Sequence, residues 1–307
     1  MDVLSCASYN FMIPCGVSLY SLYKNSENQD LHFHIIIDES VSNAQVETFY
    51  SFFCNNLHCK LSFYNINVND IKQYLIEVNN RFRIPIYYRL LMANIIPSNI
   101  EKIIYIDSDV LVRHDLTELW NYDISDYTIA AVENQSDGSC FYKRLNYPKE
   151  IGYFNSGVLL VNLKKWREQS LSDCFIDYIK CNPEKLINPD QDVLNYVLKD
   201  TKMNLPLKYN VQEAFYRIEM NSKLKLHLSD VIEARENPYI LHFTELKPWE
   251  KLCNHPLKQL FFIYKRETPW DKDCNIHYTL IEKIKRTLHH LNILSNEQVY
   301  ISIRLKK

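Results

Sequence analysis

A short apolar run that ends in two carboxylates restricts the fold of this chain more than any other feature. The run covers residues 103–106, and Asp107 and Asp109 follow it at once. An apolar run of this length is typical of a strand covered on both faces, in the middle of a parallel α/β sheet. Ligands of such sheets gather at the carboxyl ends of the strands. We therefore expect the two aspartates where a cation such as Mg²⁺ or Mn²⁺, which prefers oxygen ligands, would be held.

The Asp-x-Asp pattern is weak evidence by itself. The chain has 18 aspartates in 307 residues, so chance alone predicts about one such pair. Three are present, at Asp107/Asp109, Asp190/Asp192 and Asp271/Asp273. The first is distinguished by the strand-like run before it, but context alone leaves two interpretations open: a metal site, or a solvated strand end.

Strand and helix patterns alternate along the chain up to residue 250. The expected strands are 3–7, 31–37, 60–66, 103–106, 127–132, 152–161 and 239–243, and the expected helices are 17–23, 46–53, 86–96, 164–181 and 190–198. Ser42 and Gln45 form a capping-box pattern before the second helix. The polar stretch 133–150 is expected to be a long loop. The alternation predicts βαβ units and an α/β fold with a mostly parallel central sheet flanked by helices.

The charges divide unevenly along the chain. A formal net charge of −2 argues against nucleic acid as the main partner. Residues 251–307 carry 11 Lys and Arg against 5 Asp and Glu, whereas residues 1–250 carry 24 against 32. We therefore divide the chain into a main domain, 1–250, and a basic extension, 251–307. A basic tail on an acidic body favours an anionic surface as a neighbour.

The cysteines and the apolar segments bear on the compartment. The nine cysteines are odd in number and scattered, without a Cys-x-x-Cys pair, so reduced, buried thiols are expected. The N-terminus lacks a basic segment followed by an apolar core, and no window approaches the 18 apolar residues of a spanning helix. A cytoplasmic protein is therefore expected.

Four sequence blocks in a fixed order resemble the retaining glycosyltransferases of family 8, in particular bacterial lipopolysaccharide galactosyl- and glucosyltransferases. The blocks are Tyr-Ile-Asp-Ser-Asp-Val-Leu-Val (105–112), Tyr-Phe-Asn-Ser-Gly-Val-Leu-Leu-Val-Asn-Leu (153–163), Asp-Gln-Asp-Val-Leu-Asn (190–195) and His-Phe-Thr-Glu-Leu-Lys-Pro-Trp (242–249). Tyr87-Tyr88-Arg89-Leu90 and the first strand extend the likeness toward residue 3. No single block would be specific, but their combination is.

The resemblance implies a GT-A fold, with a Rossmann-like nucleotide-binding half continuous with an acceptor-binding half over residues 1–250. It implies a UDP-sugar donor and Mn²⁺, with Mg²⁺ as the alternative ion, held by Asp107, Asp109 and His242. Two carboxylates and one imidazole suit Mn²⁺ better than Ca²⁺. The donor-binding positions that it implies are Ala7, Ser8, Asn10, Arg81, Arg89, Asp107, Ser108, Asn155, Asp190, Gln191 and Lys247.

The resemblance also implies the chemistry. A hexose, galactose or glucose, passes to a saccharide or glycolipid acceptor with retention of configuration. Gln191 matches the side chain nearest the anomeric carbon, but an amide is a poor nucleophile, and two displacements would require a carboxylate there. We therefore favour front-face substitution, with Gln191 and Asp190 as the catalytic residues that stabilise an oxocarbenium-like centre. Loops 133–150 and 210–217 are expected to bind the acceptor.

Two departures from the family pattern keep other functions open. Ser8 stands where relatives have an aspartate near uridine, and a hydroxyl supplies no charge. Glu245 replaces a glycine, and the spacing from His242 to Lys247 is one residue short. A catalytically silent sugar-nucleotide-binding protein therefore remains an alternative. A nucleotidyltransferase is a further one, although the four glycines do not form the Gly-rich phosphate loop that it needs.

An amphipathic pattern marks the tail. Leu280, Ile284, Leu288, Leu291 and Leu294 recur at helical spacing among lysines, arginines and histidines. A basic amphipathic helix can lie on an anionic membrane or pack on the domain with its basic face in solvent. The resemblance favours the first, as a peripheral contact of residues 276–307 with the inner face of the cell membrane.

Overall fold

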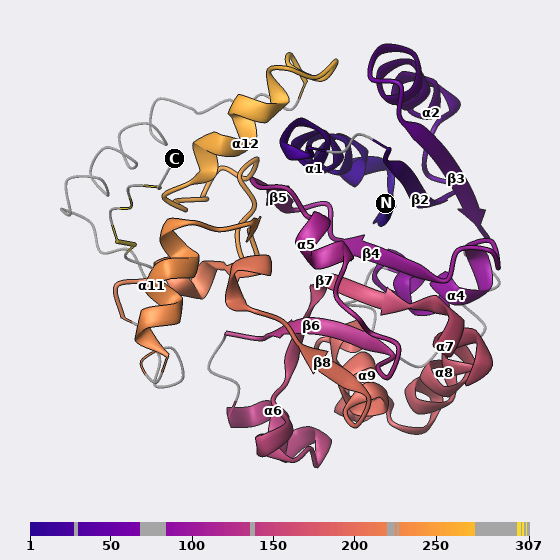
Figure 1. Cartoon of the computed structure of the whole chain (residues 1–307), viewed down its shortest axis with the longest axis vertical. Helices are drawn as coiled ribbons and strands as arrows, with labels where there is room; N and C mark the ends of the chain where they lie inside the picture. Colours follow the sequence, from indigo (N-terminus) through magenta and orange to yellow (C-terminus); the bar gives the residue numbers. More distant parts are fainter. Residues whose placement is uncertain are drawn as a thin grey trace.

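A seven-stranded sheet forms the centre of the molecule (Figure 1). The computed structural model describes residues 1–27, 30–67, 84–135, 139–219, 225, 227–273, 300, 301, 303 and 305. The sheet order is β3-β2-β1-β4-β7-β6-β8. The strands are β1 (Asp2–Ala7), β2 (His32–Asp38), β3 (Lys60–Ile66), β4 (Lys102–Ile106), β6 (Ile129–Glu133), β7 (Phe154–Asn162) and β8 (Lys202–Asn204).

Parallel pairing predominates in this sheet, as the sequence predicts. Strands β1, β2, β3 and β4 run parallel, and so do β6 and β8, whereas β7 is antiparallel to both β4 and β6. Strand β1 lies between β2 and β4, so the chain order changes direction beside it. In open α/β sheets the crevice at such a point, outside the carboxyl ends of the strands, is where ligands bind.

Helices cover both faces of the sheet, which explains why its central strands are largely apolar and buried. Val3, Ile35 and Ile104 face one layer, and Leu4 and Ile103 face the other. The first layer holds α1 (Met12–Asn25), α2 (Asn43–Phe49), the π-helix Tyr50–Asn56 and α5 (Thr117–Trp120). The second holds α4 (Met92–Ile95), α7 (Leu163–Glu168), α8 (Leu171–Cys181) and α9 (Pro189–Leu198). The predicted capping box of Ser42 and Gln45 starts α2.

A small second sheet stands beside the first, in the order β5-β10-β9. Its strands are β5 (Val110–Val112), β9 (Val211–Gln212) and β10 (Ile240–His242). The pairing of β10 with β5 is antiparallel and places His242 opposite Val110. Residues of α11 (Leu228–Glu236) and α12 (Lys258–Lys265) close the core of this sheet. The strand register therefore places His242, which is late in the chain, next to the end of the Asp-x-Asp segment.

The segment after residue 250 packs on the first helix. Trp270 lies so close to Gly16 that a Cβ there would come within 2.3 Å of its ring, and the Glu267 carboxylate accepts a hydrogen bond of 2.7 Å from the Tyr20 hydroxyl. The division at residue 250 stays a prediction. Of the predicted tail, 276–307, residues 276–299 lie outside the described part of the chain, and no described helix is long and apolar enough to span a membrane.

Two sequence-based expectations about local structure are wrong. The helix expected over 164–181 is broken into α7 and α8 by Ser170, which adopts a left-handed backbone at φ 49°. The loop expected over 133–150 contains α6 (Ser139–Leu145) and the first residues of a short 3₁₀ helix, Lys149–Ile151. The helix expected over 86–96 is confirmed, as a 3₁₀ helix, Ile84–Leu91, that continues into α4. Polar composition and helical periodicity do not resolve such short or broken turns.

The seven cysteines that the structure describes are free, as expected. Cys174 and Cys181 are exposed, however, whereas burial was expected. Both lie on the solvent-exposed side of α8, where a small thiol is tolerated.

Candidate metal and donor site

A cleft of about 410 Å³ opens at the carboxyl end of β4, beside the point where the sheet order changes direction. The predicted site residues that line it are Arg89, Asp107, Asp109, Asn155, Asp190, Gln191, His242 and Lys247. Asn134, Gln212, Ala214 and Arg217 also line it, so both predicted acceptor loops contribute to its wall. The sequence blocks, which are up to about 140 residues apart, therefore meet in one cavity.

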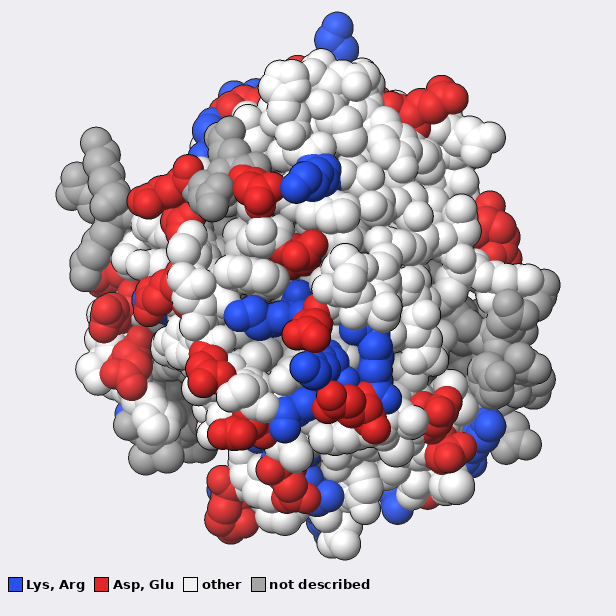
Figure 2. All heavy atoms as spheres, turned by 45° about the vertical axis from the view of Figure 1, so that its right-hand side comes forward, with Lys and Arg blue, Asp and Glu red and all other residues white. Residues whose placement is uncertain are grey.

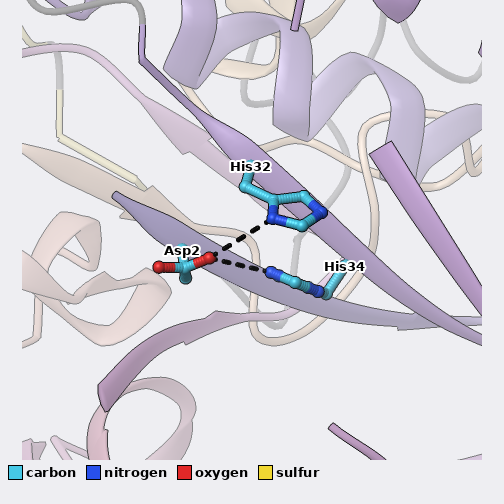
Figure 3. A group of neighbouring side chains, drawn as sticks. All are labelled: Asp2, His32 and His34. Carbon is cyan, nitrogen blue, oxygen red and sulfur yellow. Dashed lines mark hydrogen bonds and ion pairs between the residues drawn. The ribbon is translucent and has the colours of Figure 1, made fainter. Parts of the chain in front are cut away.

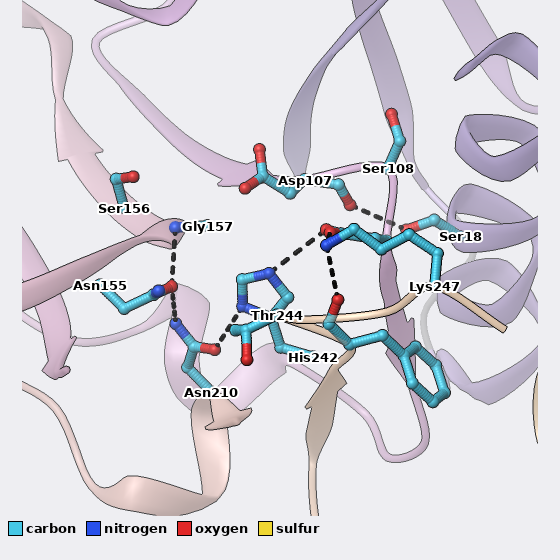
Figure 4. A network of polar contacts seen from close by, with 12 residues as sticks. Ser18, Asp107, Ser108, Asn155, Ser156, Gly157, Asn210, His242, Thr244 and Lys247 are labelled. Carbon is cyan, nitrogen blue, oxygen red and sulfur yellow. Dashed lines mark hydrogen bonds and ion pairs between the residues drawn. The ribbon is translucent and has the colours of Figure 1, made fainter. Parts of the chain in front are cut away.

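Asp107, Asp109 and His242 come together as the predicted metal group. Figure 4 shows Asp107 and His242 at this site, with Lys247 beside them. Asp107 follows β4, Asp109 precedes β5, and His242 ends β10, so the antiparallel pairing of β5 and β10 closes the triangle. One ligand atom from each side chain lies within 4.8 Å of the others. The three side chains form a group that could hold a divalent metal ion.

Each of the two carboxylates is paired with a cation. The Asp107 Oδ1 atom lies 2.8 Å from the Arg89 guanidinium and accepts a hydrogen bond of 2.7 Å from the Tyr105 hydroxyl. The Asp109 Oδ2 atom lies 2.5 Å from Lys247 Nζ. Burial alone would raise the pKa of Asp109, but Lys247 and His242 outweigh it and hold that pKa well below its usual range. Burial lowers and Asp109 raises the pKa of Lys247, with a net rise, so both groups stay charged.

A chain of hydrogen bonds orients the His242 imidazole. The backbone N–H of Gly157 donates to Asn155 Oδ1 over 3.0 Å, and Asn210 Nδ2 donates to the same oxygen over 2.9 Å. The remaining Asn210 oxygen then lies 2.9 Å from His242 Nδ1. Because an amide oxygen only accepts, Nδ1 carries a proton, and in a singly protonated ring Nε2 presents its lone pair.

That lone pair points at another acceptor. His242 Nε2 lies 3.2 Å from Asp109 Oδ1, and Oδ1 is buried with no hydrogen-bond donor among the described residues. Two acceptors at this distance repel unless a proton or a cation lies between them. A metal ion satisfies both atoms at once, so the local polarity of the site fits a cation bound by Asp109 and His242.

Gly157 leaves the space that this arrangement needs. A Cβ at this position would lie 2.2 Å from His242 Cε1 and 2.8 Å from Asp107 Oδ2. Both distances are far below van der Waals contact. Residue 157 lies on β7, where any larger side chain would displace two of the three prospective ligands. The glycine of the Asn-Ser-Gly block is therefore required by close approach.

The charged side chains at the centre of the site carry a net negative charge. The carboxylates of Asp107, Asp109 and Asp190 face the cations Arg89 and Lys247, and Arg89 also lies 3.2 Å from Asp190. A divalent cation would change the sign of the centre from negative to positive, which suits an anionic ligand.

Asp190 and Gln191 lie side by side at the start of α9, as the sequence predicts, and both are tied to Ser156. The Ser156 hydroxyl donates to Asp190 Oδ2 over 3.0 Å, and the Ser156 backbone N–H donates to Gln191 Oε1 over 3.0 Å. Burial, opposed by Arg89, gives Asp190 a raised pKa. The Gln191 carbonyl oxygen is thereby committed to a backbone N–H group.

Asp192, two residues after Asp190, has a structural role. Arg144 donates to both of its oxygens, at 2.8 and 2.9 Å, and the Tyr153 hydroxyl donates at 2.7 Å. The backbone N–H groups of Ile187 and Asn188 donate to it as well. Its side chain is fully buried and does not line the cleft.

The remaining donor positions lie beside the cleft. Ala7 ends β1 and Ser8 follows it, Asn10 is exposed, and the Ser108 hydroxyl donates to the Cys6 carbonyl over 3.2 Å. None of the four lines the 410 Å³ cavity, and their contact with a nucleotide stays a prediction. Arg81 lies outside the described residues.

The substituted glutamate lines the same cleft and pairs there with an arginine. Glu245 lies 3.1 Å from the Arg217 guanidinium and is half exposed. Lys247, whose position is one residue early, still reaches Asp109. The sequence signals did not indicate the orienting role of Asn210, because this residue lies outside every block and 32 positions from His242.

Comparisons with known proteins agree with this fold. The chain has the fold of a known glycosyltransferase: the structure of the galactosyltransferase LgtC, with donor and acceptor sugar analogues, superposes with a TM-score of 0.74 at 20% identity, covering 93% of this chain and 100% of that one. The model of the family "Glycosyl transferase family 8" matches residues 2–253. The chain belongs to glycosyl transferase family 8 and is a glycosyltransferase of that family.

Several relatives share almost the whole chain. General stress protein A of Bacillus subtilis is 29% identical over 279 residues, which cover 88% of this chain and 95% of that protein. Lipopolysaccharide 1,2-glucosyltransferase of Escherichia coli is 26% identical, covering 92% and 82%. Lipopolysaccharide 1,3-galactosyltransferase of Salmonella typhimurium is 24% identical, covering 92% and 82%.

Proposed function

We propose that this chain is a retaining hexosyltransferase that moves galactose or glucose from a UDP-sugar to a saccharide acceptor of a cell-surface glycan, with Mn²⁺ as the preferred ion. The observation that carries the proposal is the group of Asp107, Asp109 and His242 in a cleft where a sheet of this family binds ligands. The names of the relatives, which include glucosyl- and galactosyltransferases of lipopolysaccharide, support a hexose.

The ligand set supports Mn²⁺ or Mg²⁺ over softer ions. Two carboxylates and one imidazole form a hard, oxygen-rich group. Asp107, Asp109 and His242 would hold the ion, which acts as a Lewis acid on the diphosphate and stabilises the charge that develops on the leaving nucleotide. Lys247 and Arg89 keep both carboxylates ionised and place positive charge beside the cleft.

The engagement of the nearby carboxylates supports front-face substitution. A double displacement requires a carboxylate free to attack the anomeric carbon. Asp190 is bound by Ser156 and Arg89, and Asp192 is saturated and buried. Gln191 accepts from a backbone N–H group and has no lone pair on its amide nitrogen to offer. Asp190 and Gln191 then act by stabilising positive charge at the sugar, while the departing diphosphate assists deprotonation of the acceptor hydroxyl.

A donor screen tests this function. UDP release from UDP-galactose and UDP-glucose is measured with Mn²⁺, with Mg²⁺ and with EDTA, each with and without a mixture of saccharide acceptors. We expect turnover of one donor that EDTA abolishes and Mn²⁺ restores better than Mg²⁺. A glycosyl adduct on Asp190 of the unmodified enzyme would overturn front-face substitution.

The departures from the family pattern at Ser8 and Glu245 leave a second candidate function, and the same assay distinguishes it from the enzyme. A silent sugar-nucleotide-binding protein would bind UDP-sugars saturably without releasing UDP. The contact of Glu245 with Arg217 favours the enzyme, because the guanidinium offsets the extra negative charge in the wall of the cleft. A nucleotidyltransferase would instead release or consume pyrophosphate.

The surface and the tail support a peripheral location rather than a nucleic-acid partner. On the face shown in Figure 2, basic and acidic side chains are interspersed, without an extended basic stripe. We propose that the chain works in the cytoplasm and that residues 276–307 contact an anionic membrane, because of their basic amphipathic pattern. Sedimentation with anionic liposomes, lost on deletion of 276–307, is the expected result; unchanged sedimentation would contradict it.

A further inference from the structure

A second group of metal-ligating side chains lies at the opposite end of β1 from the cleft. Asp2 begins β1, and its register partner on β2 is His32. His34, two residues further along β2, projects from the same face of the sheet (Figure 3). The three side chains offer one ligand atom each within 4.8 Å of one another. The catalytic cleft does not use any of them.

We propose that Asp2, His32 and His34 form a second metal site, which we call the edge site, and that it binds a divalent transition ion such as Zn²⁺. Two imidazoles and one carboxylate are a nitrogen-rich set, which Zn²⁺, Co²⁺ and Ni²⁺ prefer over Mn²⁺ and Mg²⁺. The ion would tie the first two strands of the sheet together at their amino ends.

The distances have the size that such coordination needs. Asp2 Oδ1 lies 3.0 Å from His34 Nε2 and 3.5 Å from His32 Nδ1. In a tetrahedral zinc site with bonds of about 2.0–2.1 Å, neighbouring ligand atoms lie about 3.3 Å apart. Both measured edges lie close to this value, so the ion needs only small side-chain movements to enter.

The outer atoms of both imidazoles are already held. His32 Nε2 lies 2.9 Å from the Ser62 hydroxyl, and His34 Nδ1 lies 2.9 Å from the Tyr64 hydroxyl. Both hydroxyls lie on β3, and their oxygens can accept a hydrogen bond from a ring N–H group. When they do, the ring nitrogens that face Asp2 present lone pairs, as metal-bound histidines require.

The exposure of the group leaves a path for the ion. His34 is fully buried, whereas the side chains of Asp2 and His32 are 28% and 29% exposed, so solvent reaches the group. Two cations stand near it, and both are partnered: Lys60 pairs with the Asp30 carboxylate, and the terminal amine donates to the Asp30 backbone carbonyl.

Zinc titration of the full chain, with any purification tag at the C-terminus, tests the edge site. Zn²⁺ alone is titrated calorimetrically, and Co²⁺ is followed by its visible absorption. We expect His32→Ala and Asp2→Asn each to lose one bound ion, with affinity reduced by more than about 100-fold, since even the loss of outer hydrogen bonds costs 10- to 100-fold. Asp109→Asn, which impairs only the cleft, and His227→Ala, which removes an exposed histidine elsewhere, should keep that ion.

The outcomes are independent of the proposed function. Mn²⁺-dependent UDP release should be unchanged in His32→Ala, and it serves, with thermal unfolding without metal, as the check that the variants fold. Equal zinc stoichiometry and affinity in the wild type, His32→Ala and Asp2→Asn would overturn the edge site and leave a hydrogen-bonded network. The edge site would also be overturned if the wild type bound zinc and only Asp109→Asn abolished that binding.

Discussion

Two groups of carboxylate and imidazole lie at the two ends of strand β1, and they differ in what surrounds them. In the cleft, two carboxylates and His242 are accompanied by the charged side chains Arg89 and Lys247. At the edge site, one carboxylate and two imidazoles are accompanied by the neutral hydroxyls of Ser62 and Tyr64. The same residue types therefore give an oxygen-rich centre in one place and a nitrogen-rich centre in the other.

The difference shows how the neighbours of a ligand decide its task. Arginine and lysine keep the cleft carboxylates ionised and add positive charge where a substrate anion would bind, as catalysis requires. Hydroxyls at the edge site only orient rings, which suits an ion that holds strands together. The cleft also opens to a cavity of about 410 Å³. We therefore expect mutations in the cleft to act on turnover and mutations at the edge to act on stability.

The largest expected effect is the loss of a cleft carboxylate. Asp109→Asn keeps the shape but removes the charge that faces His242 and Lys247. Mn²⁺-dependent UDP release should fall on the order of 10²- to 10³-fold, the cost of removing a main electrostatic contribution to the transition state. Turnover is measured at saturating Mn²⁺ and donor.

A matched control for this variant lies in another Asp-x-Asp pair. Asp273 is exposed near the end of the described main chain, and Asp273→Asn should leave turnover unchanged. An Asp109→Asn enzyme with near wild-type turnover would show that the cleft group does not carry the chemistry, and the contrast with the edge site would disappear.

A smaller loss is expected when the cleft ligands are displaced rather than removed. In Gly157→Ala the new methyl group would meet His242 Cε1 at 2.2 Å and Asp107 Oδ2 at 2.8 Å. Mn²⁺ affinity, measured by electron paramagnetic resonance, should fall about 10- to 100-fold, as for other disturbances of ligand orientation. Zinc titration of the same variant is the internal control, because residue 157 does not touch Asp2, His32 or His34. Unchanged Mn²⁺ affinity would mean that the ion binds elsewhere.

Much of the cleft could be predicted from the sequence because its residues stand in local patterns. Strand β3 has the predicted bounds, Lys60–Ile66, and Asp107 follows an apolar strand as expected. His242 was located by the motif that it begins. Such signals are local, so that periodicity and short motifs reveal them.

The edge site and the orientation of His242 could not be predicted because they depend on strand register. Asp2 and His32 are 30 residues apart, and only the pairing of β1 with β2 places them opposite each other. Asn210 reaches His242 only after β9 pairs with β10. Register is set by packing over whole strands, and a shift of one residue would turn these side chains to the other face.

The orienting chain in the cleft gives the next prediction. Asn210→Leu removes the acceptor for His242 Nδ1–H and the donor to Asn155. Mn²⁺ affinity should fall about tenfold, at the lower end of the effects of outer hydrogen bonds on metal sites. Asn210→Asp keeps the acceptor and should restore part of the affinity. If Asn210 had only a structural role, both variants would have the same Mn²⁺ affinity and would differ only in thermal stability.

A third buried histidine shows what burial does to an imidazole without a carboxylate beside it. His255 is packed between the rings of Tyr216 and Phe243, and its Nδ1 accepts a hydrogen bond of 3.1 Å from the Leu257 backbone N–H. Burial, assisted by the charge of Lys258, lowers the pKa of His255 to about 3. Both metal groups differ from it in that an aspartate faces the ring.

The sign of the pH effect follows from this lowered pKa. Between about pH 6.5 and the folded pKa, the unfolded chain binds more protons at His255 than the folded chain does, so stability falls as the pH falls. From pH 6.5 to 5 the loss from this residue is about 1.5 kcal/mol. His255→Phe should be less stable at pH 6.5, because the Leu257 N–H loses its acceptor, but its urea unfolding free energy should decline less on acidification. His227→Phe, at an exposed site, should decline as the wild type does. An equal decline of the unfolding free energy in His255→Phe and the wild type would show that the buried imidazole is already charged. Burial alone would then not distinguish His255 from the rings that face an aspartate.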